Sequence, residues 1–120
     1  MKGYLFLEYP ACSTCRKAKK WLDEQKVNYT DRHIVEERPT CEELKIWFER
    51  SGLPLRKFFN TSGLLYKSMQ LKEKLDGMSE EKQLELLASD GKLVKRPLVI
   101  GEDFVLVGFK PEEWEKVLLK

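Results

Sequence analysis

Two cysteines three positions apart, Cys12 and Cys15, are the residues of this sequence best placed for chemistry. They follow the apolar run Tyr4–Leu7, which is typical of a buried strand, and precede a stretch with helical spacing of apolar residues. A helix start presents unpaired N–H groups and the positive end of the helix dipole, and both stabilise a thiolate more than a thiol. The motif therefore predicts redox chemistry, with a lowered pKa for the exposed thiol.

The two thiols are expected to have different roles. Cys12 lies first at the helix end and is predicted to be the nucleophile, whereas Cys15, one turn into the helix, would resolve a mixed disulfide by attacking Cys12. A zinc site is the main alternative, but closed zinc sites need four ligands. The remaining candidates, His33 and Cys41, match no familiar second pair, so the sequence favours redox chemistry over zinc and over inert thiols.

Positive charge close to the pair is expected to matter. Arg16 is the first residue of a basic run. This run is either a solvated helix face or a source of positive charge that lowers the pKa of the thiols. Arg96 precedes Pro97, which favours extended backbone at the arginine. Its guanidinium could then hold a thiolate or an oxyanion by forked hydrogen bonds, and a surface ion pair is the alternative. Pro97 is either a simple strand opener or the second residue of a cis peptide bond.

Size and composition restrict the possible classes of protein. The chain has 120 residues, 35% charged and 42% hydrophobic, which fits one globular domain. A net charge of +2 gives no general argument for nucleic acid or membrane partners. No stretch has the pattern of a secretory signal or a membrane span. We therefore expect a reducing cytoplasm, where a close cysteine pair is more often catalytic or metal-binding than structural.

Strands and helices alternate at the two ends of the chain. We expect strands at about Gly3–Glu8 and Val27–Ile34 around a helix at Cys12–Gln25, then a hairpin of Leu98–Ile100 and Phe104–Val107 before a helix opened by Pro111. In the middle, helices are expected from the Thr40–Glu43 capping box to Gly52, at Leu55–Phe59, and from Ser79 to Gly91.

This order predicts an α/β fold. The first two strands are joined by a crossover and should be parallel, whereas the hairpin is antiparallel, giving a mixed sheet with helices on both faces. Residues 36–92 are expected to be helical, to be the most exposed part, and to form a lid or subdomain. They lack a flexible Gly/Ser linker, so residues 1–120 are predicted to be a single domain with a helical insertion at about 36–92.

Four segments together resemble the arsenate reductase (ArsC)/Spx family, in particular its uncharacterised ArsC-like branch. They are Tyr9–Ala18, Leu55–Gly63, Lys95–Leu98 and Gly108–Lys110. The resemblance extends in order over essentially the whole chain. It implies a thioredoxin-like fold with a four-stranded mixed sheet and a helical insertion, the reactive cysteine at Cys12, and the cis proline at Pro97.

The sequence departs from the glutathione-linked arsenate reductases of this family in four places. Those enzymes have serine at the position of Cys15 and surround arsenate with three arginines. Of these only Arg96 is present, and the other positions hold Asn60 and Lys110; Glu8 replaces a histidine near the reactive cysteine. Each charge-assisted hydrogen bond that is lost costs about 1.5–3 kcal/mol. These changes predict weaker arsenate binding.

The residues and the resemblance lead to two functional predictions. The first is a cytoplasmic thiol-disulfide oxidoreductase without a bound cofactor or metal, acting on a small oxyanion or a disulfide and regenerated by glutathione or a thioredoxin-type reductant. Its expected binding and thiolate-stabilising residues are Arg96, Lys110, Asn60, Arg16 and Pro97. The second, implied by the Spx branch, is a redox-sensing transcription regulator that binds the RNA polymerase α-subunit.

Overall fold

A computed structural model describes residues 3–119 of the chain. The N-terminal part forms β1 (Tyr4–Glu8), α1 (Ser13–Glu24) and β2 (Tyr29–His33). The two strands are parallel, and Tyr4 is opposite Tyr29. The predicted crossover is therefore confirmed, with each strand shorter than the sequence pattern suggested.

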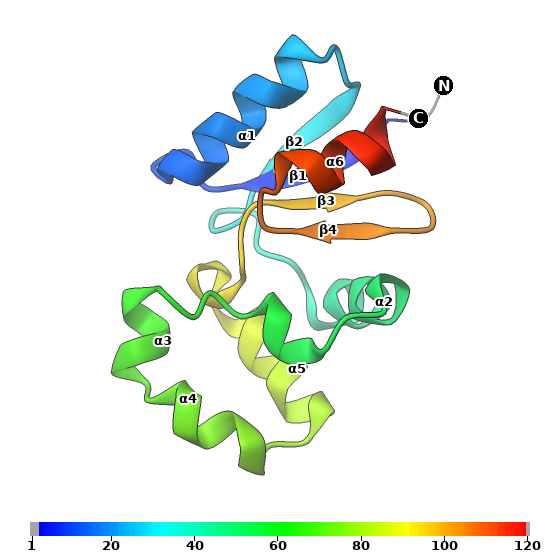
Figure 1. The fold of residues 1–120 in the computed structure, drawn as a ribbon. Coiled ribbons are helices and arrows are strands. Elements are labelled where there is room, and N and C mark those ends of the chain that lie inside the picture. The colour runs from blue at the N-terminus through cyan, green and yellow to red at the C-terminus, as the bar shows by residue number, and fades with distance from the viewer. Residues whose placement is uncertain (1–2, 120) are drawn as a thin grey trace.

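The C-terminal part completes the sheet with β3 (Leu98–Ile100) and β4 (Val105–Val107), followed by α6 (Pro111–Leu118). β3 pairs antiparallel with β1 and with β4, so the strand order is β2-β1-β3-β4 (Figure 1). Pro111 lies in the first turn of α6, as predicted. β4 lies at the edge of the sheet.

The middle of the chain is helical throughout. Its elements are α2 (Cys41–Ser51), η1 (Leu55–Phe58), α3 (Leu64–Ser68), α4 (Leu71–Lys74), η2 (Leu75–Gly77), α5 (Glu80–Ser89) and η3 (Gly91–Leu93). The predicted capping box is present, since Thr40 accepts from the Glu43 N–H while the Glu43 carboxylate accepts from the Thr40 N–H. Gly52 ends α2 with φ 69°, a conformation that favours glycine.

Two features of this middle part were not predicted correctly. Helices α3 and α4 were missed because neither has a side-chain N-cap, the signal on which the prediction relied. Gly91 was predicted to end α5 as its C-terminal glycine, but Asp90 is the C-cap and Gly91 begins η3. Gly91 is required by a close contact instead, since a Cβ at this position would lie 2.0 Å from the carbonyl oxygen of Ile34.

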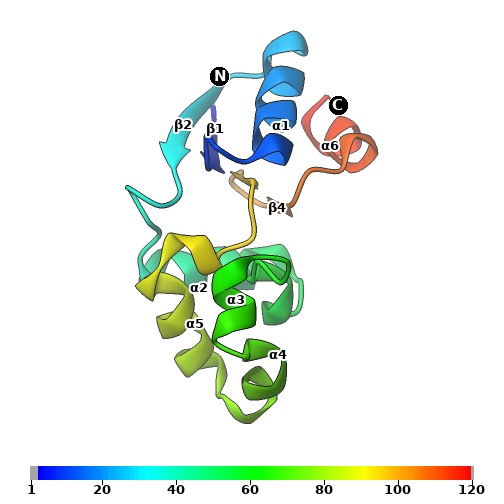
Figure 2. The ribbon, with the colours of Figure 1, turned by 90° about the vertical axis from the view of Figure 1, so that its left-hand side faces the viewer.

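The sheet separates two apolar clusters. Helices α1 and α6 cover one face, around Phe6, Leu22 and Trp114. The helical insertion covers the other face and buries a larger cluster against Leu7 and Leu98 (Figures 1 and 2). The predicted class, a mixed α/β sheet with helices on both faces and a helical insertion, is confirmed. Residues of the insertion supply most of that larger cluster.

Among the described residues, no helix is both long enough and apolar enough to cross a bilayer.

Candidate active site

The loop between β1 and α1 places Cys12 at the start of the helix. Cys12 is the N-cap residue of α1, with extended backbone. Its N–H donates to the carbonyl of Tyr9 at 2.9 Å, and its carbonyl accepts from the N–H of Arg16 at 3.1 Å. Its side chain is half-buried. Cys12 thus lies at the N-terminal end of α1, as the sequence predicted, where the helix dipole favours a thiolate.

Cys15 lies one turn deeper and is fully buried. Its Sγ accepts a hydrogen bond from the N–H of Tyr9, at 3.5 Å. Burial is the main cause that raises the pKa of Cys15, to about 12, and the neighbouring Cys12 thiolate contributes in the same direction, whereas the Tyr9 N–H acts against both. At neutral pH, Cys15 is therefore a protonated thiol.

Cys12 has the opposite tendency. Burial opposes its ionisation, but hydrogen bonds from the Cys15 N–H and thiol and from the Arg96 guanidinium, together with the charge of Arg96, lower the pKa of Cys12 below its ordinary value. All three cysteines of the chain are free thiols in this structure. The pair thus consists of an accessible, acidic thiol above a buried, weakly acidic one.

Arg96 faces this pair from the segment before β3. Its guanidinium carbon lies 4.9 Å from the centre of the Tyr9 ring, close enough for a cation–π contact. Its Nη1 atom is buried and has no hydrogen-bond partner among residues 3–119. The Arg96–Pro97 peptide bond is cis, which confirms the implication of the family resemblance. The free Nη1 donor is available to an anion bound beside Cys12.

The other predicted site residues lie at different distances from the thiols. Asn60 is buried, and its amide donates to the carbonyl of Lys92 at 3.4 Å. This hydrogen bond links the segment after η1 to η3. Lys110 is exposed at the N-terminus of α6. Arg16 is exposed, and its Nη1 donates to the carbonyl of Pro10 at 3.1 Å. Arg16 thus stabilises the loop between β1 and α1 from its solvent-exposed side. Asn60 and Lys110 instead line a groove that begins at Cys12.

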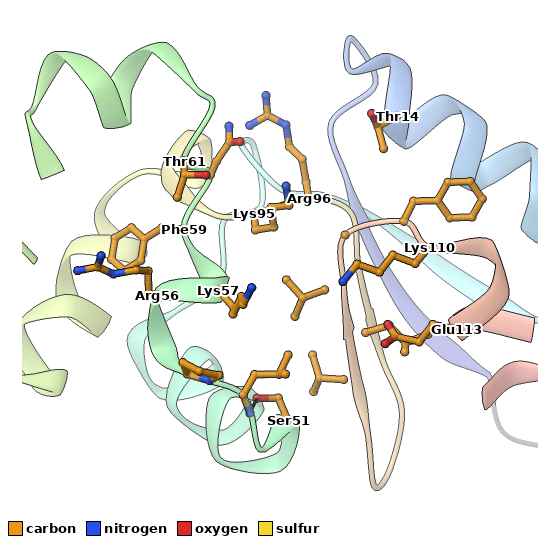
Figure 3. Close-up of a pocket in the computed structure, with 18 of the residues that line it drawn as sticks. Thr14, Ser51, Arg56, Lys57, Phe59, Thr61, Lys95, Arg96, Lys110 and Glu113 are labelled. Carbon is orange, nitrogen blue, oxygen red and sulfur yellow. Dashed lines mark hydrogen bonds between the residues drawn. The ribbon is translucent and has the colours of Figure 1, made fainter. Parts of the chain in front are cut away.

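A groove of about 1090 Å³ runs from Cys12 between the insertion and the β3–β4–α6 unit. Figure 3 shows Lys57 and Lys110 extending into it from opposite walls, with Lys95 and Arg96 on the segment above them in this view. Lys57 and Lys95 were not singled out as site residues from the sequence. Both lie in segments that carried the family resemblance, so those segments held the only signal that could have identified them.

Glu8 is an unusual residue beneath the cysteine loop. It is the last residue of β1, is only 5% exposed, and lies on the sheet face covered by α1. Burial, a hydrogen bond with Asp31 and the negative charge of Asp31 together raise the pKa of Glu8 to about 7, although the positive charge of Lys19 acts to lower it. Lys19 and Asp31 form an ion pair at 3.2 Å. A carboxyl that is half-protonated near neutral pH therefore lies directly before Tyr9.

The sequence matches the ArsC family over residues 7–117. The chain belongs to the ArsC family. It is 57% identical over 111 residues to the uncharacterized protein YusI of Bacillus subtilis, covering 92% of this chain and 94% of that protein. It is 31% identical over 115 residues to the regulatory protein MgsR of the same organism, covering 96% and 90%.

A solved structure of an ArsC family related protein from Bacteroides fragilis superposes with a TM-score of 0.93 at 65% identity, covering 97% of this chain and 98% of that one. The predicted membership of the ArsC/Spx family is therefore confirmed, and with it the thioredoxin-like fold of this ArsC-family chain. The relatives include both a regulator and an uncharacterized protein, so membership alone does not select an activity.

The alternative zinc site finds no support in the geometry. Within residues 3–119, no three or more His, Cys, Asp and Glu side chains are grouped so that they could hold a metal ion. His33 lies at the end of β2, where its Nδ1 accepts from the N–H groups of Val35 and Glu36 at 3.2 and 3.0 Å. Its ring packs edge-on against Tyr9. His33 thus stabilises the turn after β2.

Proposed function

We propose that this ArsC-family protein is a thiol-disulfide oxidoreductase in which Cys12 is the nucleophile and Cys15 the resolving thiol. The observation that carries the proposal is the placement of half-buried Cys12 at the start of α1, one turn before the fully buried Cys15. The pKa of Cys12 is lowered by the Cys15 N–H and thiol and by Arg96, although burial opposes this, whereas burial raises the pKa of Cys15 to about 12. Thiolates, not thiols, attack disulfides.

In the first step the Cys12 thiolate attacks one sulfur of a substrate disulfide. A bond forms between Cys12 Sγ and that sulfur, the substrate S–S bond breaks, and the other substrate sulfur leaves as a thiolate that takes a proton from water. The Arg96 guanidinium lies beside Cys12 and would stabilise negative charge on the attacking or departing sulfur. The product is a mixed disulfide on Cys12.

In the second step the Cys15 thiol gives its proton to water, which returns it to the departing sulfur, and the Cys15 thiolate attacks Cys12 Sγ. The Cys12–Cys15 disulfide forms while the bound substrate sulfur leaves as a thiolate. The negative charge of Cys12 helps to hold the pKa of Cys15 high. This charge is absent in the mixed disulfide, so Cys15 becomes more acidic when its attack is needed. An external thiol, glutathione or a thioredoxin-type protein, would return two electrons and restore both thiols.

Arsenate is a less favourable substrate for this site. A compact oxyanion needs several convergent forked donors. Arg96 provides one guanidinium, Lys110 provides a charge without a fork, and Asn60 provides a neutral amide that donates one hydrogen bond to the carbonyl of Lys92. The same site suits a sulfur substrate better, because a single departing thiolate needs only one such donor.

The test compares Cys12→Ser, Cys15→Ser and Cys41→Ser proteins on a peptide disulfide, with dithiothreitol as reductant. Cys12→Ser should lose turnover, and Cys15→Ser incubated with the peptide disulfide without dithiothreitol should accumulate a mixed disulfide visible by mass spectrometry. Cys41→Ser is the matched control, since Cys41 lies at the start of α2 outside the groove. Alkylation of Cys12 with the pH dependence of an ordinary thiol, without turnover of any disulfide, would exclude the proposal.

A second candidate is a redox-sensing regulator that binds the RNA polymerase α-subunit. It is favoured by the similarity to MgsR, a regulatory protein by name, over 96% of this chain. Immobilised α-subunit should then retain the protein, with a difference between its reduced and oxidised forms. Retention without disulfide turnover would favour the regulator, and turnover without retention the enzyme.

A further inference from the structure

The groove beside Cys12 is much larger than a small oxyanion requires. Its volume of about 1090 Å³ is at or above the range of roughly 300–1,000 Å³ that is usual for sites binding whole drug-sized molecules. One wall follows residues 103–110 without interruption, and the opposite wall extends from the end of α2 to Gly63. Within this wall Val105–Val107 form the strand β4, and the residues on either side of it extend the wall. The groove therefore has room for a short peptide segment.

The wall formed by β4 also presents unpaired backbone groups. The N–H of Gly108 donates to the carbonyl of Pro97 at 2.9 Å. Because hydrogen-bonded pairs alternate along an antiparallel ladder, the next residue of β4 whose backbone groups point at β3 is Leu106. The N–H and C=O groups of Val105 and Val107 therefore point away from β3. β4 is the edge of the sheet, so these groups are available to an added strand.

The charges along the groove select the kind of peptide. The cationic side chains that line it are Arg50, Arg56, Lys57, Lys95, Arg96 and Lys110, against the carboxylates of Asp103 and Glu113. Arg50 donates to the carbonyl of Gly101, and Arg56 is paired with Asp76. Lys57, Lys95 and Lys110 make no ion pair or hydrogen bond through their ammonium groups with any described residue, and Figure 3 shows Lys57 and Lys110 pointing into the groove. Free ammonium groups around an open groove attract carboxylates.

We propose that the groove binds an extended acidic protein segment that carries the substrate disulfide, pairs with the backbone of β4, and places its sulfur at Cys12. The inference rests on the proposed oxidoreductase function and names its substrate class. Cys12 and Gly108 lie at the same end of the groove, because β4 ends where β1 ends and β3 begins. The segment would thus lie along Val107 and Val105 with its cysteine beyond the C-terminal end of β4.

The reaction is the one already described, with the segment as one half of the disulfide. Cys12 attacks the disulfide, Cys15 displaces the bound sulfur from Cys12, and the segment leaves as a free thiol. The protein is oxidised to the Cys12–Cys15 disulfide, and two electrons pass to the segment and its former sulfur partner. Lys57, Lys95 and Lys110 bind the carboxylates and take no part in bond making.

The test uses synthetic peptides of about eight residues, each with a single cysteine near one end carried as a methyl disulfide. One peptide has several glutamates, and its counterpart has glutamines at the same positions. Release of the peptide thiol is followed by chromatography with dithiothreitol as reductant. We expect kcat/KM for the acidic peptide to exceed that for its counterpart by about tenfold at low salt, and the difference to shrink as salt is added.

Charge reversal identifies the binding residues. Lys57→Glu should remove or invert the preference for the acidic peptide. Lys45→Glu is the matched control, since Lys45 is an exposed lysine of α2 that does not line the groove, and it should keep the preference. Circular dichroism melting establishes that both proteins are folded.

Strand pairing is tested separately by N-methylation of alternate peptide amides in two offset registers. Only amides that face β4 donate to it, so one register should lower kcat/KM at least severalfold and the other should not. A tripeptide truncated around the cysteine should also be a poor substrate. Equal use of the tripeptide would identify a small peptide thiol as the ligand and overturn strand addition.

The two failures can be told apart. If no peptide is reduced and Cys12 alkylates like an ordinary thiol, the oxidoreductase function itself is wrong. If acidic, neutral, truncated and N-methylated peptides are all reduced at similar rates, the function stands and the acidic segment is overturned.

Discussion

Replacing Glu8 by glutamine is expected to stabilise the protein at neutral and alkaline pH. Burial, together with Asp31, raises the pKa of Glu8 from 4.5 to about 7. Glutamine has the shape of the protonated carboxyl and, like it, can donate a hydrogen bond to Asp31. It removes a charge from a side chain that is only 5% exposed.

The sign and size of the effect follow from proton linkage. A carboxyl whose pKa is raised on folding binds more protons in the native state than in the unfolded state, so stability falls as pH rises. For Glu8 the loss begins above 4.5 and is complete a little above 7. At about 1.4 kcal/mol for each pH unit, the ionised carboxylate costs roughly 3 kcal/mol of folding free energy at pH 8 and almost nothing at pH 4.

Urea unfolding of the wild-type and Glu8→Gln proteins between pH 4 and pH 8 measures this directly. The difference in unfolding free energy should be near zero at pH 4 and grow to roughly 3 kcal/mol in favour of the variant at pH 8. Glu24→Gln, at an exposed carboxylate in the last turn of α1, should show no such growth. A difference that is flat with pH, or a variant less stable at pH 8, would refute the reasoning.

Two further predictions concern the site and its support. Arg96→Met removes a hydrogen bond and a charge that lower the pKa of Cys12, so alkylation of Cys12 near pH 6 should slow by about tenfold. Arg96→Lys should give an intermediate rate. An unchanged pH profile of alkylation would show that Arg96 does not lower the pKa of the thiol. Gly91→Ala would force a Cβ to 2.0 Å from the carbonyl of Ile34 and should cost about 3 kcal/mol in urea unfolding, whereas Gly77→Ala, with open space around it, should be close to neutral.

The elements that the sequence predicted well are those whose signals are local. The capping box at Thr40 and Glu43, and Pro111 at the start of α6, are fixed by short-range hydrogen bonding and by proline geometry, and the structure has both where they were expected. The position of Cys12 at a helix start follows from the same kind of signal. Caps and turns need no knowledge of the rest of the chain.

The features that were missed depend on contacts between distant segments. Gly91 resembles a helix-ending glycine in the sequence, but what requires it is the backbone of Ile34, more than fifty positions earlier. Likewise, nothing local marks Lys57 or Lys95 as site residues. They face one groove only because η1 of the insertion and the segment before β3 meet near Cys12.

The distribution of positive charge links the chemistry to the choice of substrate. Only one guanidinium, that of Arg96, lies beside the reactive sulfur, and its buried Nη1 has no partner among the described residues. This arrangement suits one transient negative charge, either on Cys12 or on a departing sulfur. The other unpaired cations, Lys57, Lys95 and Lys110, are spread along a groove of about 1090 Å³. Ammonium groups that are flexible and separated bind dispersed carboxylates better than a compact oxyanion, which needs rigid forked donors at one point. A thiol pair at the end of such a groove is therefore better matched to a sulfur carried on a long acidic chain than to arsenate.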